Sequence, residues 1–211
     1  SVEVRIDQLI AVMDAAGIER PTVIGVSEGG ITACLAAAAR PDRVAQLILL
    51  NAVAGGFDRR SKGELSDAEF DAWRDFILAT AAQWGEGRDG DRWLAGIPDP
   101  DAAWGRLQRA CATRAVARDY MAAVEDGLSA WDVLEAIHQP ALVLQRRDDP
   151  IAKLGFARAE AKRIPHAKLV ELDERVPAPG RHGRRHAAAP PSRVRCHSSG
   201  STGWKHAVRW P

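Results

Sequence analysis

The feature that most constrains this chain is the run at residues 25–30, which reads Gly-Val-Ser-Glu-Gly-Gly and contains a G-x-S-x-G motif. The apolar run at 21–24 precedes it, and the alanine-rich stretch at 31–39 follows it. A strand before this motif and a helix after it form a nucleophile elbow, a sharp turn that holds the serine in a strained backbone conformation with its hydroxyl clear of the sheet. We therefore expect Ser27 to be an exposed nucleophile.

The neighbours of Ser27 are of the types that such a turn needs. Gly25 and Gly29 lack Cβ atoms, so they are expected to let the strand and the helix pass close to each other. The start of the following helix presents unpaired N–H groups and a partial positive charge, which suit an oxyanion, and the N–H of Glu28 is the expected first donor. A glycine-rich turn with an incidental serine is the alternative interpretation.

The apolar pattern along the chain predicts alternating helices and strands. A helix is expected at the N-terminus, ending near Gly17, because apolar residues recur there at i, i+3, i+4 and i+7: Ile6, Leu9, Ile10 and Met13. Strands are expected at 22–26, 44–50, 140–145 and 167–172, and helices at 28–40 and 151–163. The run at 44–50 is largely apolar, as in a strand buried on both faces. This order is typical of a parallel α/β sheet.

The pattern also divides the chain into four parts. We expect core strands and helices with the elbow at 1–56, an inserted helical lid at 57–137, the rest of the core with an acid loop at 138–173, and a tail at 174–211. The predicted lid is rich in tryptophan: Trp73, Trp84, Trp93, Trp104 and Trp131. We interpret these rings as packing between lid helices rather than as substrate contacts, because each buries a large apolar area.

Composition excludes several classes of protein. With 46% hydrophobic and 27% charged residues among 211, the chain is ordinary for a soluble globular protein. We find no run long enough for a membrane span and no basic-then-apolar leader. Three scattered cysteines do not suggest a disulfide framework, so a reducing cytoplasm is expected. Cys34 and Cys111 are predicted to be small apolar fillers on helices.

The tail at 174–211 differs abruptly from the rest. It holds eight Lys or Arg against one acid, whereas residues 1–173 hold 21 basic against 27 acidic residues. It lacks amphipathic periodicity, and its shift to Arg, Pro, Ala, Gly and His is typical of an out-of-frame reading of GC-rich DNA. We expect a disordered, solvated tail. The alternative is a basic tail that binds nucleic acid or a membrane surface, but the acidic body and the lack of interleaved aromatics oppose nucleic-acid binding.

Together these segments resemble the α/β-hydrolase family over about residues 3–173. The likeness rests on the elbow and on four further segments: Pro41-Asp42-Arg43-Val44, residues 142–150, Arg163-Ile164-Pro165 and residues 169–172. The form of the elbow with this lid is most similar to actinobacterial hydrolase domains found alone or fused to adenylate or guanylate cyclase domains, and no cyclase portion is visible here. The resemblance implies a partial α/β-hydrolase sheet with an inserted helical lid.

The resemblance also implies the chemistry of the site. Ser27 would be the nucleophile, and Asp149, with Asp148 as the neighbouring alternative, would be the acid that orients a histidine. An aspartate before Pro150 also favours a turn, which is the other interpretation of this segment. The substrate would be a small acyl compound, and no metal or organic cofactor is implied.

Two departures from the family bear on this expectation. The histidine should lie near 175–178, where the chain reads Arg-Val-Pro-Ala, so His182 is the candidate base. His138 and His166 are interpreted as structural. The early strands of the family are absent, and with them the second oxyanion donor, which would leave an apolar sheet edge that favours self-association.

The sequence therefore predicts a serine hydrolase that acts on carboxylic esters or related acyl substrates through Ser-His-Asp chemistry. The alternative is a truncated or frameshifted remnant that does not catalyse. Nucleic-acid binding through the tail is a third hypothesis, which would show a steep fall of affinity with salt.

Overall fold

The computed structural model describes residues 2–94, 96–173 and 195–197, which fall into two compact units. The first unit holds residues 2–64, 128–172 and 195–197, and the second holds 65–127 and Asp173. The elements are, in chain order, α1 Val2–Ala15, β1 Thr22–Val26, α2 Gly29–Ala39, β2 Gln46–Leu50, η1 Arg59–Lys62, α3 Asp67–Ala82, α4 Gly90–Trp93, α5 Pro100–Cys111, α6 Arg114–Glu125, η2 Trp131–Ala136, β3 Ala141–Arg146, α7 Leu154–Arg163, β4 Ala167–Leu172 and β5 Arg195–His197. Over the described part of the chain, no helix is long and apolar enough to cross a membrane.

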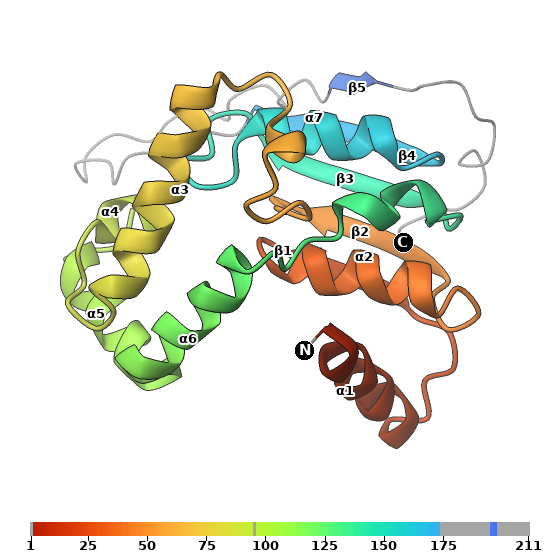
Figure 1. Ribbon diagram of the computed structural model, residues 1–211, viewed down its shortest axis with the longest axis horizontal. Helices are drawn as coiled ribbons and strands as arrows, with labels where there is room; N and C mark the ends of the chain where they lie inside the picture. Colours follow the sequence, from red (N-terminus) through yellow and green to blue (C-terminus); the bar gives the residue numbers. More distant parts are fainter. Residues whose placement is uncertain (1, 95, 174–194, 198–211) are drawn as a thin grey trace, which may run out of the picture. The chain divides into compact units, whose positions relative to one another are not determined.

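The first unit is built on a sheet in the order β1-β2-β3-β4-β5 (Figure 1). The first four strands are parallel, which confirms the predicted fold class. Val26 pairs with Leu50, and Leu50 pairs with Leu144, so the carboxyl ends of β1, β2 and β3 lie at one edge of the sheet. Side chains that follow these strands therefore meet at this edge.

Helices pack against this sheet as a layer. α2 contacts β1 and β2, α7 contacts β3 and β4, and η2 contacts both helices. In β2, Leu47 and Leu49 are fully buried, whereas Ile48 and Leu50, which point to the opposite face, are only half-buried. The prediction that this strand is buried on both faces is therefore wrong for the described chain, because an apolar run alone does not show how many faces are covered.

β1 lies at an edge of the described sheet. Its Ile24 and Val26 side chains are 59% and 54% exposed. Such an edge presents unpaired backbone groups beside apolar surface, which favours pairing with another chain. Self-association through β1 stays a prediction.

Three residues of the stretch predicted to be disordered nonetheless form a strand. β5 pairs antiparallel with β4, with His197 opposite Leu169. The outer edge of β4 offers unpaired backbone groups, which accept a strand of almost any sequence.

The second unit consists of helices held by capped ends and aromatic contacts. α3 begins with a full capping box, in which the Ser66 hydroxyl accepts from the Glu69 N–H and the Glu69 carboxylate accepts from the Ser66 N–H. Trp93 stacks on Trp104 with ring centroids 4.9 Å apart, and Trp84 meets Trp104 edge-on at 6.0 Å. These rings pack between helices, as predicted.

Trp131 differs from the other tryptophans because it belongs to η2 in the sheet unit. Residues 57–64 and 128–137 also group with the sheet, so the separate helical unit is shorter than the predicted lid. That this unit acts as a lid stays a prediction.

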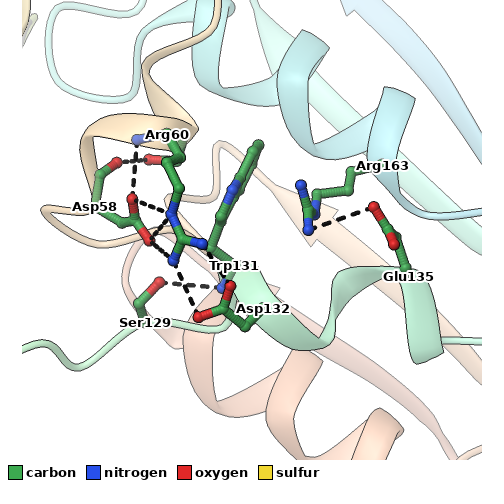
Figure 2. A network of polar contacts seen from close by, with 8 residues as sticks. Asp58, Arg60, Ser129, Trp131, Asp132, Glu135 and Arg163 are labelled. Atoms are coloured by element: carbon green, nitrogen blue, oxygen red, sulfur yellow. Dashed lines mark hydrogen bonds and ion pairs between the residues drawn. The ribbon is translucent and has the colours of Figure 1, made fainter.

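A polar network ties the loop after β2 to η2 (Figure 2). The Arg60 guanidinium bonds the Asp58 carboxylate at 2.6 Å and the Asp132 carboxylate at 2.7 Å. These bonds lower the pKa of both carboxyls from their ordinary value. On the other side of η2, Arg163 of α7 lies 4.8 Å from the centroid of the Trp131 ring and pairs with Glu135 at 3.3 Å. These contacts hold the loop that follows β2 against η2.

Candidate active site

Ser27 lies in the turn between β1 and α2, in the conformation expected for an elbow. Its φ is +52°, a left-handed value that a side chain other than glycine rarely adopts. The turn is held in place because the Ser27 N–H donates to the Leu50 carbonyl at 3.2 Å, and its carbonyl accepts from the Val53 N–H at 3.0 Å. The side chain is exposed, and none of the described residues hydrogen-bonds its hydroxyl. Backbone strain at an exposed serine is the arrangement that the motif predicted.

The close approach of strand and helix depends on Gly25 and Gly30. A Cβ on Gly25 would lie 2.8 Å from the Gly30 Cα and 2.9 Å from the Ala33 Cβ. A Cβ on Gly30 would lie 2.8 Å from the Ala52 Cβ. Gly29 has no atom within 4 Å of its Cβ position, so the prediction that Gly29 permits the approach is wrong, and Gly30 has that role.

Glu28 precedes the first residue of α2, and its backbone N–H is well placed to serve as a donor. No described residue accepts a hydrogen bond from this N–H, which leaves it available beside the partial positive charge of the helix start. The Glu28 carboxylate forms an ion pair with Arg5 of α1 at 2.6 Å. The ion pair ties the elbow to the first helix.

Asp149 follows β3 at the same edge of the sheet and is half-buried. Its Oδ1 accepts from the N–H groups of Ile151 and Ala152 at 2.9 and 2.8 Å. Its Oδ2 accepts from the Asn51 amide at 3.2 Å. The carboxylate therefore organises the turn with one oxygen and directs the other toward β2. The interpretation of Asp149 as a turn residue is thus compatible with its interpretation as the acid of the site. The neighbouring Asp148 is exposed.

Asn51 is a residue of the site that the sequence reasoning missed. It comes directly after β2, between the strands that precede Ser27 and Asp149, and its φ is +43°. Its amide donates to Asp149, and its Oδ1 accepts from the Arg146 N–H at 3.0 Å. The available signal was an asparagine, which tolerates the left-handed conformation, immediately after a predicted strand.

The loop that carries Asp149 is anchored by buried polar groups on both sides. Gln145 is fully buried, and its amide donates to the Ala152 carbonyl at 2.6 Å. Glu171 of β4 is also buried and pairs with Arg147 at 2.7 Å and with Arg158 at 2.9 Å. A buried carboxylate is tolerated here because two guanidinium groups bond it. These contacts fix the backbone on which Asp149 stands.

Neither of the two histidines whose side chains are described lies at this edge. His138 and His166 are exposed and come just before β3 and β4, at the amino ends of these strands. Six residues of β3, roughly 20 Å of extended chain, separate that end from Asp149. Their interpretation as structural residues stays a prediction. His182 lies outside the described residues.

α7 contributes a buried carboxyl group that bonds the loop after β2. Glu160 is fully buried, and its Oε1 accepts from the Ala54 N–H at 2.6 Å. Burial raises the pKa of this carboxyl to about 8, against the opposing effect of the Ala54 and Gly55 N–H groups.

Cys34 on α2 is also fully buried, as predicted, and burial raises the pKa of its thiol. Cys111 is exposed, so the prediction that it fills the core is wrong.

No group of three or more His, Cys, Asp or Glu side chains in the described part of the chain is arranged to hold a metal ion.

Comparison with known proteins identifies a family and a related sequence. Residues 3–175 match the family described as alpha/beta hydrolase fold. A Caulobacter sp. (strain K31) protein named carbamate hydrolase, RutD, is 27% identical over 183 residues, which cover 77% of this chain and 60% of that protein. The chain thus spans about three-fifths of the length of this curated relative.

Solved structures are similar in fold. An esterase (EaEST) from Exiguobacterium antarcticum aligns over 79% of this chain and 63% of its own, with 20% identity and a TM-score of 0.62. The enol-lactonase from Burkholderia xenovorans LB400 aligns over 82% of this chain and 65% of its own, with 23% identity and a TM-score of 0.60.

Proposed function

Because the chain belongs to the α/β-hydrolase family, we propose that it is a serine hydrolase with Ser27 as its nucleophile. The observation that carries the proposal is the strained, exposed Ser27 next to a helix N-terminus, at the same edge of the sheet as the Asp149 carboxylate. A positive φ at a serine costs free energy, and such strain is kept where it orients a functional group.

In this proposal the Ser27 hydroxyl attacks an acyl carbonyl carbon while a histidine takes its proton. The Glu28 N–H donates to the oxyanion that forms, and Asp149 holds the histidine in the correct tautomer. Collapse of the tetrahedral intermediate expels the alcohol, which receives the proton from the histidine. Water then hydrolyses the acyl-enzyme by the same steps, so Ser27 is regenerated.

Asn51 supports this mechanism as a positioning residue for Asp149. It donates to the Oδ2 of the carboxylate, while the two N–H groups of the turn hold Oδ1. With these three bonds the carboxylate rotates little, so a histidine that approaches it meets an acceptor of fixed direction.

The base is proposed to be His182. The family pattern requires a histidine after the last parallel strand, β4, and His182 is the first one in the chain after that strand. The second oxyanion donor has no assignment in this chain. The absence of one such donor lowers the rate of a hydrolase of this type by about 10²- to 10³-fold.

The proposed substrates are carboxylic esters and related acyl compounds. The RutD relative is named for a carbamate, which has the same acyl carbonyl attached to a heteroatom leaving group. Stabilisation of an oxyanion at such a carbonyl does not depend on which heteroatom leaves, so the same residues serve both classes.

The test is hydrolysis of p-nitrophenyl acetate and butyrate by the parent chain and by matched variants. Ser27→Ala should abolish turnover, Asp149→Asn should lower it by several orders of magnitude, and His182→Ala should match Ser27→Ala. His166→Ala, at the opposite edge of the sheet, is the control and should keep the parent rate. Turnover that persists in folded Ser27→Ala would refute the proposal.

A specific observation also favours the remnant hypothesis, because the histidines with described side chains both lie at the wrong end of the strands. If the parent chain is folded by circular dichroism and hydrolyses no ester, and if His182→Ala changes nothing, the chain is a non-catalytic relative of the hydrolases.

A further inference from the structure

The helical unit contains a pocket that the catalytic proposal does not use. The pocket lies among α3, α4, α5 and α6, has a volume of about 370 Å³, and is lined by residues 77–121 of this unit alone. This volume lies within the range of small-molecule sites, toward its lower end. The pocket is therefore large enough for one small organic molecule.

The wall of the pocket is almost entirely apolar. Its larger members are Ile77, Trp84, Trp93, Val116, Tyr120 and Met121. The Trp84 ring is fixed because its Nε1 donates to the carbonyls of Gln108 and Ala112 at 2.9 and 3.0 Å. The Trp93 ring is fixed between Trp104 and Phe76, whose centroids lie 4.9 and 5.9 Å away. The aromatic wall is therefore rigid and preformed, as it is in ligand sites.

None of the residues that line the pocket is an Asp, Glu, Lys, Arg or His, and the Trp93 Nε1 is a buried donor that no described residue bonds. The Thr80 hydroxyl donates to the Phe76 carbonyl at 3.0 Å. Two arginines close in sequence to lining residues are engaged elsewhere: Arg109 donates to the Gly85 carbonyl, and Arg114 bonds Glu86 at 2.9 Å and the Trp84 carbonyl at 3.1 Å. A charged ligand would lose its hydration without gaining an oppositely charged side chain in the pocket wall.

From this lining we infer that the helical unit binds one uncharged, apolar molecule of medium size, such as a fused aromatic ring system or a medium-length alkyl group. The rigid indole walls favour flat or slender shapes, and Met121 adapts to either because its side chain is flexible. The inference does not depend on Ser27, since the lining residues belong to the helical unit alone.

Cys111 provides a probe of this pocket. It lines the pocket, is exposed and is not in a disulfide, whereas Cys34 is fully buried in the other unit. In a Cys196→Ser protein, iodoacetamide should alkylate Cys111 and leave Cys34 unmodified. The uncharged ligand N-phenyl-1-naphthylamine, at ten times its dissociation constant, should slow Cys111 alkylation about elevenfold, because only the free fraction reacts.

A pair of matched variants separates the pocket from the rest of the unit. Ala117 is buried and lines the pocket, whereas Ala115 on the same helix is exposed and does not. Ala117→Phe should fill the pocket and reduce the fluorescence enhancement of N-phenyl-1-naphthylamine at least tenfold. Ala115→Phe and Ser27→Ala should leave the enhancement unchanged, and the latter keeps this test independent of catalysis.

Equal alkylation of Cys111 with and without the ligand would overturn the inference, and so would equal ligand binding by folded Ala117→Phe and the parent. The alkylation measurement requires no change in the pocket, so it decides the question even if Ala117→Phe does not fold. Strong binding of the anionic analogue 1-anilinonaphthalene-8-sulfonate with no binding of the uncharged ligand would also contradict it.

Discussion

Glu160 should make the stability of this protein depend on pH in an unusual direction. Its carboxyl is fully buried on α7, where only one oxygen has a hydrogen-bond partner. Burial raises its pKa from the ordinary value of 4.5 to about 8. Between these two values the folded state holds a proton that the unfolded state releases, so the free energy of unfolding falls as pH rises. Most acidic groups in proteins have the opposite effect.

The magnitude follows from the size of the shift. A gap of about 3.5 units between the folded and unfolded pKa corresponds to roughly 4–5 kcal/mol, at about 1.4 kcal/mol per unit. The contribution is fully present below pH 4.5 and is lost as pH rises toward 8. This figure is an upper value, because small backbone movements that admit water would reduce it.

The assay compares the parent with Glu160→Gln by urea unfolding, followed by tryptophan fluorescence at pH 5 to 9. The glutamine keeps an acceptor for the Ala54 N–H but buries an unpaired amide, which costs about 1–3 kcal/mol at every pH. The variant should therefore be less stable than the parent at pH 5 and more stable at pH 9. Glu135→Gln, at an exposed position, is the control for removal of a carboxyl. A stability difference between parent and Glu160→Gln that stays constant with pH would refute the reasoning.

Two further predictions concern the elbow and its neighbour. Gly25→Ala places a Cβ 2.8 Å from the Gly30 backbone and should destabilise the fold by about 1–3 kcal/mol, whereas Gly29→Ala meets open space and should be neutral or stabilising by up to about 1 kcal/mol, both measured by urea unfolding. A larger loss for Gly29→Ala than for Gly25→Ala would contradict the assigned packing. Asn51→Gly should lose the bonds to Asp149 and Arg146 without strain, and Asn51→Ala should be less stable than Asn51→Gly by about 1–2 kcal/mol, because alanine disfavours a positive φ. Both Asn51 variants should lower ester hydrolysis, and equal stability of the two would argue against a strained position.

The parts of the fold that could be predicted from sequence are those set by local pattern. The strand at 22–26 and the last parallel strand at 167–172 were placed at their observed bounds, because short segments rich in apolar residues there are bounded by turn residues. The turn at Ser27 could be predicted because the motif encodes its own backbone geometry. The end of α1 at Gly17 could also be predicted from local sequence. A glycine adopts the left-handed conformation there, which allows the Ile18 N–H to reach the Met13 carbonyl.

The parts that could not be predicted depend on contacts between distant segments. Whether Gly29 or Gly30 lies against a neighbour is decided by the position of Ala52, which is far along the chain. Asn51 acts only because β2 lies between β1 and β3, and strand order is not visible in a single strand. Glu160 lies on a helix with ordinary charged residues, and nothing local marks it as buried. Cys111 resembles a core residue in sequence but is exposed at the end of α5.

The central claim is that Ser27 is an activated nucleophile, and covalent labelling tests it most directly. A fluorophosphonate probe reacts with a serine only when a base draws off its proton and the oxyanion is stabilised. Intact mass should show one adduct on the parent chain, peptide mapping should place it on Ser27, and Ser27→Ala should show none. Folded parent protein that remains unlabelled, or an adduct that persists in Ser27→Ala, would contradict the account.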